Sequence, residues 1–215
     1  MKKRILCYGD SNTWGYMPGT GNRYPDDVRW TKLLQKSLGD EYEIIESGIS
    51  GRTTVFDKGW NEYLNGKKGL GYALLTHCPI DGAIVMLGGN DLVEHTAESS
   101  KNGIDEIVRM LINTDQVFRG TCKMLNDGFK VLVVIPPHHP EIATKGVMAY
   151  RAIADKRLQI TEYYKEVAKN RNVDCLDATD LAEVSDIDCL HLSEKGHKQL
   201  AEALTIKIKE MYEKE

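Results

Sequence analysis

The stretch GAIVML (82–87) is an unbroken apolar run of strand length. Such a run is typical of a parallel β-strand that helices cover on both faces. A second run of this kind, KVLVVI (130–135), ends at two prolines. Three shorter candidate strands complete the set, namely RILCY (4–8), YEIIES (42–47) and VDCLD (173–177). The sequence therefore predicts a five-stranded, mainly parallel sheet.

Segments with helical periodicity alternate with these strands. Helices are expected over 26–38, over 104–125, over 149–168, and from Ser193, an expected N-cap, toward the end of the chain. Strands that alternate with helices form a parallel sheet between two helical layers. We therefore expect an α/β fold, a three-layer α/β/α sandwich. No linker or repeat divides the chain, so residues 1–215 are expected to form one domain.

Composition and charge argue against several classes of protein. Apolar residues make up 41% and charged residues 28% of the 215 residues, as in ordinary globular proteins. The net charge of −4 gives no basic surface for nucleic acid, and no segment approaches the ~20 apolar residues of a membrane span. The first apolar run is shorter than the ~7 residues of a secretory signal core, and the five cysteines form no C-x-x-C pair. We expect a cytoplasmic protein with no nucleic-acid or membrane partner.

Residues that can carry chemistry follow the predicted strands. In an open α/β sheet the ligand crevice lies outside the carboxyl ends of the strands. The candidates at those ends are Asp10, Ser11, Gly48, Asn90, Asp91, His138, His139, Asp188 and His191. Their position favours a functional site before any motif is considered. We interpret Asp10 and Asp91 as residues that hold loops together by hydrogen bonds.

Five of these residues provide the groups that acyl transfer by a serine requires. The reaction needs a hydroxyl, a neutral imidazole to accept its proton, a carboxylate to orient the imidazole, and donors for the oxyanion. Ser11 offers the hydroxyl on a tight turn. Asp188 and His191 are three residues apart, which in a helical turn places both side chains on one face. Gly48 can offer an unhindered backbone N–H, and Asn90 a side-chain amide donor.

Four short motifs carry a resemblance to a known family. GDSN (9–12), SGISG (47–51), GGND (88–91) and DCLH (188–191) occur in this order and span most of the chain. Each motif is weak alone, but together, at strand ends, they resemble the sequence blocks of the SGNH (GDSL-type) hydrolases. Wider runs look most like the arylesterase and acyltransferase branch of that family: RILCYGDSNTWG, DVRW, GISGRTT, IVMLGGND and KVLVVIPP.

The resemblance implies a flavodoxin-like fold, hydrolysis of an ester or thioester of a small molecule, and no metal or other cofactor. It implies that Ser11 is the nucleophile and also donates its own backbone N–H to the oxyanion. Gly48 and Asn90 would be the other donors of the oxyanion hole, Asp188 the orienting acid and His191 the general base. Members of this branch often self-associate, so a homo-oligomer is expected.

One residue departs from the family pattern, because Asn12 stands where a leucine usually follows the serine. The change leaves the reacting groups in place and alters either the floor of the pocket or the turn. Together with Trp14 and His138, Asn12 is a candidate for lining the substrate pocket.

The leading hypothesis is a serine esterase that forms an acyl-enzyme on Ser11, acts on esters of small, short-chain acyl groups and is able to pass the acyl group to alcohols as well as water. The alternative is a metal-dependent phosphoesterase that uses the strand-end aspartates and histidines. Such enzymes usually open with Asp-x-His, whereas this chain has Asp10, Ser11 and Asn12. A third class, a non-catalytic binding module, predicts no turnover.

Overall fold

The computed structural model describes residues 2–59, 61–118, 122–138 and 148–213, so the expectation for His139 lies outside the described residues. The strands form one sheet in the order β2-β1-β3-β4-β5, and each neighbouring pair is parallel. The strands are β1 (Lys3–Gly9), β2 (Tyr42–Gly48), β3 (Ile80–Met86), β4 (Leu125–Ile135) and β5 (Asp174–Asp177). The predicted five-stranded parallel sheet is confirmed.

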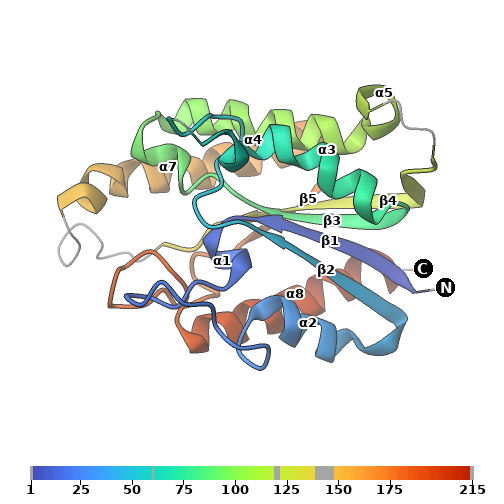
Figure 1. Ribbon diagram of the computed structural model, residues 1–215, viewed down its shortest axis with the longest axis horizontal. Coiled ribbons are helices and arrows are strands. Elements are labelled where there is room, and N and C mark those ends of the chain that lie inside the picture. Colours follow the sequence, from blue (N-terminus) through green and yellow to red (C-terminus); the bar gives the residue numbers. More distant parts are fainter. Residues whose placement is uncertain (1, 60, 119–121, 139–147, 214–215) are drawn as a thin grey trace.

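Helices cover both faces of this sheet. The helices are α1 (Ser11–Trp14), α2 (Trp30–Leu38), α3 (Gly66–His77), α4 (Ala97–Ile112), α5 (Thr114–Phe118), α7 (Met148–Arg171) and α8 (Glu194–Glu213). Single 3₁₀ turns lie at Gly39–Glu41, Glu62–Leu64 and Asp91–Val93. In Figure 1, α3, α4 and α7 lie on one side of the sheet, and α2 and α8 lie on the other. The predicted α/β/α sandwich is therefore confirmed.

The apolar run of β3 shows why the sheet needs a helical layer on each side. Successive side chains of a strand point to opposite faces. Ala83 and Val85 therefore pack into the core beneath α3, α4 and α7, and Ile84 and Met86 pack into the core beneath α2 and α8. All four side chains are at most 2% exposed. A single continuous apolar run thus supplies both cores.

The prediction of one long helix over 104–125 is wrong, because the helix is interrupted after Ile112 and only the short helix α5 follows it. Helix α4 ends at Ile112, and strand β4 begins at Leu125. Asn113 ends the helix, and its side-chain amide donates a hydrogen bond of 2.8 Å to the carbonyl of Arg109. Asparagine side chains compete in this way with the regular hydrogen bonds of a helix. Between Asn113 and Leu125 only Thr114–Phe118 is helical within the described residues, as the short helix α5, and Leu125 already belongs to β4.

Helix α3 was not predicted, because its first half is rich in glycine. The glycines permit close packing: a Cβ at Gly66 would lie 2.5 Å from the carbonyl oxygen of Thr53, and one at Gly71 would lie 2.8 Å from the ring of Phe118. Asn65 caps the helix by accepting a hydrogen bond of 3.2 Å from the backbone N–H of Lys68. Packing and this cap outweigh the low helix propensity of glycine.

The ends of two other helices test the local sequence signals. The helix predicted over 26–38 begins only at Trp30, because Val28 and Arg29 instead form a turn that bonds back to the carbonyl of Pro25. Ser193 caps α8 as predicted, since its hydroxyl accepts the N–H of Gly196 at 3.0 Å. No helix within the described ranges is long and apolar enough to cross a membrane.

Candidate active site

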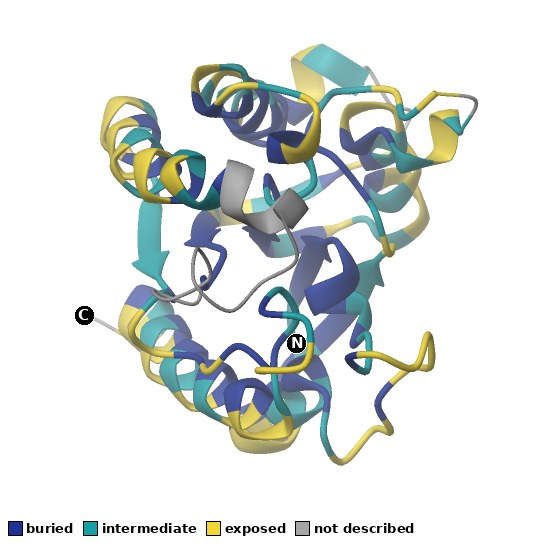
Figure 2. Ribbon diagram, turned by 90° about the vertical axis from the view of Figure 1, so that its left-hand side faces the viewer, coloured by how far each residue is buried: buried dark blue, intermediate teal, exposed yellow. Residues whose placement is uncertain are grey.

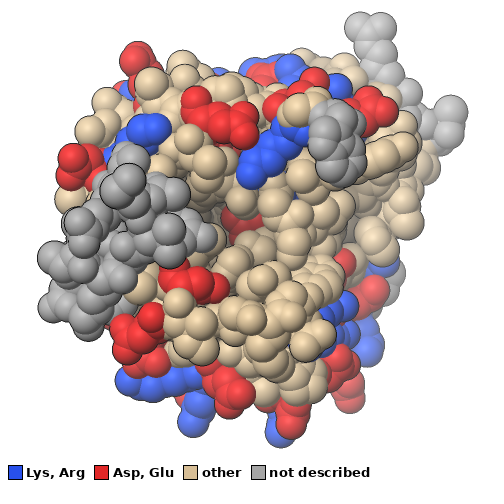
Figure 3. All heavy atoms as spheres, turned by 60° about the vertical axis from the view of Figure 1, so that its left-hand side comes forward, with Lys and Arg blue, Asp and Glu red and all other residues tan. Residues whose placement is uncertain are grey.

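The candidate residues meet at the carboxyl ends of the strands, the end that faces the viewer in Figure 2. Strand β1 ends at Gly9, and the chain turns at once into the single-turn helix α1, which begins with Ser11. The Asp10 carboxylate caps this turn by accepting the N–H of Asn12 at 3.0 Å. A Cβ at Gly9 would lie 2.0 Å from the hydroxyl oxygen of Thr13, so the turn closes tightly only with glycine. The space-filling view shows this region hollowed, with acidic side chains in and around the hollow (Figure 3).

Ser11, His191 and Asp188 form a continuous hydrogen-bonded chain. The His191 Nε2 atom lies 3.0 Å from Ser11 Oγ, and His191 Nδ1 lies 2.8 Å from Asp188 Oδ2. An ionised carboxylate can only accept, so Nδ1 carries the ring proton and Nε2 presents its lone pair to the serine hydroxyl. In this arrangement the imidazole can take a proton from Ser11.

The carboxylate of Asp188 also shapes the loop that carries the histidine. Its Oδ1 atom accepts the backbone N–H groups of Leu190 at 3.1 Å and His191 at 3.0 Å. Burial alone would raise the pKa of Asp188, but hydrogen bonds from the His191 ring and from the backbone outweigh it and hold the pKa below its usual value. Asp188 is therefore an anion at neutral pH.

The helical turn expected for Asp188 and His191 is wrong, although the pairing itself is present. The two residues do not lie on a helix but on an irregular loop before α8. Cys189 between them has a positive φ of 54°, which closes a tight turn that brings the carboxylate onto the ring. The three-residue spacing was informative, although the backbone that realises it is different.

Gly48 lies at the end of β2, paired in register with Gly9. A Cβ at Gly48 would lie 2.2 Å from the backbone nitrogen of Trp14, so no other residue fits without moving α1. Arg52 Nη1 donates to the carbonyl of Ser47 and, at 2.8 Å, to that of Gly9. The Ser47 carbonyl and the Gly48 N–H belong to one rigid peptide unit and point in opposite directions. Arg52 therefore fixes the direction of the Gly48 N–H.

Asn90 follows β3 and faces the same turn. Its Nδ2 atom donates to the carbonyl of Arg52 at 3.1 Å and to Asp10 Oδ2 at 3.4 Å. Burial raises the pKa of Asp10 to about 6, although the Asn12 N–H and the charges of His191 and arginines oppose the rise. The amide of Asn90 is thus aimed at the start of α1 by two acceptors.

Asp91 ties two of these loops together. Its Oδ1 atom accepts the Thr54 N–H at 2.9 Å, and its Oδ2 atom accepts the hydroxyls of Thr54 at 2.7 Å and Ser100 at 2.9 Å. Ser100 in turn lies 2.8 Å from the buried hydroxyl of Tyr164. The loop after β3, which carries Asn90, is therefore joined to the loop after β2, as expected for a carboxylate that holds loops together.

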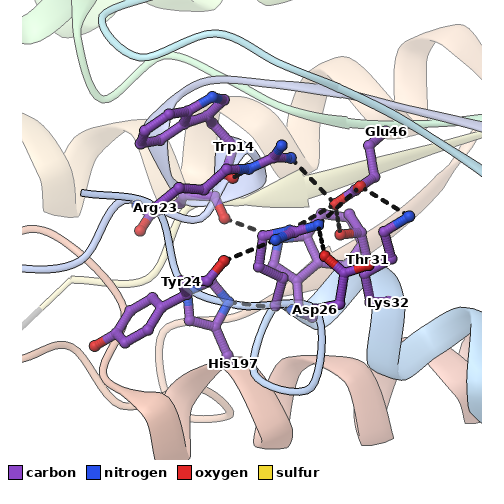
Figure 4. Close-up of polar contacts among 11 residues, drawn as sticks. Trp14, Arg23, Tyr24, Asp26, Thr31, Lys32, Glu46 and His197 are labelled. Atoms are coloured by element: carbon purple, nitrogen blue, oxygen red, sulfur yellow. Dashed lines mark hydrogen bonds and ion pairs between the residues drawn. The ribbon is translucent and has the colours of Figure 1, made fainter.

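The three candidates for the substrate pocket lie in different surroundings. Asn12 is 7% exposed, and its amide bonds to the backbone of the loop that carries His191. Trp14 stacks near the Arg23 guanidinium, 5.5 Å from the ring centroid (Figure 4). His138 lines a hollow of about 460 Å³, with its Nδ1 atom 3.4 Å from the Thr179 hydroxyl. Burial and the charge of a nearby arginine lower the pKa of His138.

Two residues at the site are not among the predicted site residues. The Tyr16 ring lies over the His191 ring with centroids 4.2 Å apart, and it covers one face of the imidazole. Arg52 is 3% exposed, and its guanidinium holds two strand ends and stacks on Tyr8. Neither contact has a sequence signal, because the partners come from other parts of the chain.

Glu46 on β2 is a third unpredicted residue, and it anchors the segment after α1 (Figure 4). Its carboxylate accepts the Arg29 Nε at 3.0 Å, the Thr31 hydroxyl, and the Lys32 ammonium at 3.2 Å. Burial alone would raise the pKa of Glu46, but these hydrogen bonds and the arginine charge lower it from 4.5 to about 2.

Replacing Glu46 by glutamine is expected to lower the free energy of unfolding by about 3 kcal/mol near pH 7, because the buried Arg29 guanidinium loses one of its two carboxylate partners among the described residues and keeps only the exposed Asp26. The stabilisation is present above pH 4.5 and is lost as the pH falls toward about 2. Urea unfolding of both proteins at pH 7 and pH 4 measures the difference, which should shrink by about 1 kcal/mol at the lower pH. Equal stabilities at pH 7 would contradict the prediction, and the exposed Glu210→Gln serves as the control.

Comparisons with known proteins address the family. The family model of the GDSL-like lipase/acylhydrolases matches residues 7–199. No match was found among curated protein sequences. Among solved structures, the native aryl esterase of M. smegmatis is 32% identical with a TM-score of 0.85, over 97% of this chain and 99% of that one. A carbohydrate acetylesterase from Sinorhizobium meliloti is 32% identical with a TM-score of 0.86, over 98% and 100%.

A putative arylesterase from Agrobacterium tumefaciens is also similar, at 27% identity and a TM-score of 0.85, over 97% of this chain and 99% of that one. The family match includes all four motifs, and the structural matches extend over nearly the whole length of the chain. The resemblance drawn from the motifs is thus confirmed. The chain belongs to the GDSL-like lipase/acylhydrolase family, whose chemistry is the hydrolysis of carboxylic esters.

Proposed function

We propose that this protein is a serine esterase that hydrolyses esters of small acyl groups through an acyl-enzyme on Ser11. The observation that carries the proposal is the chain of hydrogen bonds from Ser11 Oγ through both nitrogens of His191 to Asp188. The same geometry matches what nucleophilic catalysis by serine requires.

In the first half of the reaction, Ser11 Oγ attacks the ester carbonyl carbon while His191 Nε2 takes the hydroxyl proton. The carbonyl electron pair moves to the oxygen, and the Asp188 carboxylate stabilises the imidazolium. His191 then gives its proton to the leaving alcohol as the carbon–oxygen bond breaks. The acyl group is left esterified to Ser11.

In the second half, water replaces the alcohol. His191 Nε2 takes a proton from the water as its oxygen attacks the acyl carbon, and it returns that proton to Ser11 Oγ as the acid leaves. An alcohol that enters in place of water would give a new ester by the same steps. The proposal therefore includes acyl transfer, which is measured as the partition between acid and new ester when an alcohol is added.

The oxyanion is assigned to three donors that surround Ser11. The Ser11 N–H lies at the first position of α1, where a helix leaves its N–H groups without an intrahelical acceptor. The Gly48 N–H is oriented through Arg52, and Asn90 Nδ2 is oriented by Arg52 and Asp10. The 3.4 Å contact of Asn90 with Asp10 is the weaker one, and it is the one that the oxyanion would replace. Each such donor typically contributes about 10²- to 10³-fold to the rate.

A small acyl group fits the surroundings of the serine. Ser11 is only 8% exposed, and Tyr16 covers one face of the His191 ring. Two of the similar structures are an aryl esterase and a carbohydrate acetylesterase. Both observations support acetyl or similarly short acyl groups over long ones.

Nitrophenyl esters of increasing acyl length test this proposal. We expect kcat/KM for the acetyl ester to exceed that for the decanoyl ester by about 100-fold, since the longer chain would have to displace the groups packed around Ser11. The rates are compared with and without a metal chelator. A preference for the decanoyl ester would contradict the assignment of the acyl group.

The chelator arm addresses the phosphoesterase alternative. The alternative would use the strand-end aspartates and histidines as metal ligands. Two of them bond to other groups in the described structure: His191 bonds to Ser11 and Asp188, and Asp91 bonds to Thr54. Within the described ranges, no group of three or more His, Cys, Asp or Glu residues is arranged to hold a metal ion. Activity that disappears with the chelator and returns with a divalent metal would favour the alternative.

Self-association is part of the proposal and has one supporting feature. Strand β2 is an edge strand, and beside it lies a hollow of about 630 Å³ lined by Ile49, Tyr63 and Tyr72. The two tyrosines are 79% and 78% exposed, an unusual exposure for aromatic side chains near a sheet edge. Light scattering gives the mass in solution, and a mass of 24.2 kDa would contradict self-association.

A further inference from the structure

The residue after the candidate nucleophile is an asparagine, and its contacts give it a role of its own. We propose that Asn12 is a positioning residue that holds the loop carrying His191 in place, so that the His191 ring stays within hydrogen-bond distance of Ser11. The inference rests on the proposed function, because it assigns a task to Asn12 within the same site.

The side chain of Asn12 forms hydrogen bonds with the backbone on both sides of His191. Its Oδ1 atom accepts the N–H of Leu192 at 2.9 Å, and its Nδ2 atom donates to the carbonyl of Leu190 at 3.4 Å. These two residues flank His191 directly in the chain. One amide thus holds the backbone immediately before and after the proposed base.

The other end of this connection is fixed as well. The Asn12 N–H donates to Asp10 Oδ1 at 3.0 Å, and the Asn12 carbonyl accepts the indole N–H of Trp30 at 3.0 Å. Asn12 is 7% exposed and Trp30 is 1% exposed, so this anchor is rigid and screened from water. The turn that presents Ser11 is therefore joined to a loop about 180 residues away in the chain.

The loop that receives the amide needs such a support. It is irregular, and Cys189 has a positive φ of 54°, a conformation that residues other than glycine rarely adopt. Contacts inside the segment also shape it, such as the Ser185 N–H, which donates to the His191 carbonyl at 2.8 Å. The amide of Asn12 links the loop to the nucleophile turn itself, and so it sets the distance between Nε2 and Oγ.

A leucine at this position would fill a similar volume but could accept no hydrogen bond. The N–H of Leu192 would then be buried without its partner, because Leu192 itself is 0% exposed. A loop that shifts by about 1 Å to relieve this loss would lengthen the contact between His191 and Ser11, which typically costs about 10²-fold in rate.

The test compares Asn12→Leu and Asn12→Asp with Thr114→Val. The aspartate keeps the acceptor for Leu192 and loses the donor to Leu190. Thr114 lies at the start of α5, far from the active site. It is a matched control because it is 1% exposed and its hydroxyl donates to the carbonyls of Met110 and Leu111. Kinetics with nitrophenyl acetate are measured below the melting temperature of each variant. The rate at which a phosphonate ester labels Ser11 is measured in parallel.

We expect kcat of Asn12→Leu to fall by about 10- to 100-fold with KM changed less than about 3-fold, and the labelling rate to fall in proportion. The aspartate variant should lose less, and Thr114→Val should lose melting temperature but keep kcat. An unchanged kcat in either folded Asn12 variant, or a rise in KM alone, would overturn the positioning role. If Asn12→Leu does not fold, the aspartate variant decides alone. Full activity in Ser11→Ala would instead overturn the proposed function.

Discussion

Replacing Ser11 by alanine is expected to lower kcat for nitrophenyl acetate by about 10⁴-fold or more, while the melting temperature changes little. The serine hydroxyl is the group that forms the bond to the acyl carbon, so no neighbouring side chain can substitute for it. Its only polar partner among the described side chains is the His191 ring, at 3.0 Å. The folded protein therefore loses one partly buried hydrogen bond and no large apolar contact.

The control is a serine on the loop after β2, which takes no part in the proposed chemistry. Ser50 is exposed on the loop after β2, so Ser50→Ala should keep the activity of the wild type. A phosphonate ester should add its mass to Ser11 in the wild type and in Ser50→Ala, and to neither peptide in Ser11→Ala. Substantial turnover by Ser11→Ala would return the serine to the role of a turn residue.

The sequence predicts the parts of the site that end strands. Ser11, Gly48 and Asn90 each follow an apolar run, and the parallel sheet brings these ends to one edge. The order of the motifs along the chain, together with this edge, is enough to bring the residues together. These positions can be predicted because strand length and apolar pattern are properties of short segments.

The sequence does not predict the groups that hold the site in place. Arg52 reaches a carbonyl 43 positions away, and the amide of Asn12 reaches a loop about 180 positions away. No local pattern encodes such contacts, since they depend on the packing of the finished fold. The same limit applies to α3, where close contacts of Gly66 and Gly71 with other segments outweigh a poor local helix propensity.

Replacing Asp188 by asparagine is expected to lower kcat by about 10³- to 10⁴-fold, although the amide is nearly the same size and can keep the loop. An amide oxygen at the Oδ1 position still accepts the N–H groups of Leu190 and His191. The NH₂ group would then face His191 Nδ1 and donate to it. The imidazole would carry its proton on Nε2, the atom that must accept the proton of Ser11.

The measurement separates this tautomer effect from simple loss of structure. We expect Asp188→Asn to melt within a few degrees of the wild type and to bind substrate with a similar KM, because the loop keeps its backbone hydrogen bonds. Asp180→Asn makes the same change in charge at an exposed position upstream in the same loop, and it should keep kcat. A variant Asp188→Asn that retained most of its kcat would show that the carboxylate serves the loop alone. A large loss confined to this variant means that the orientation of one ring proton decides whether Ser11 can react.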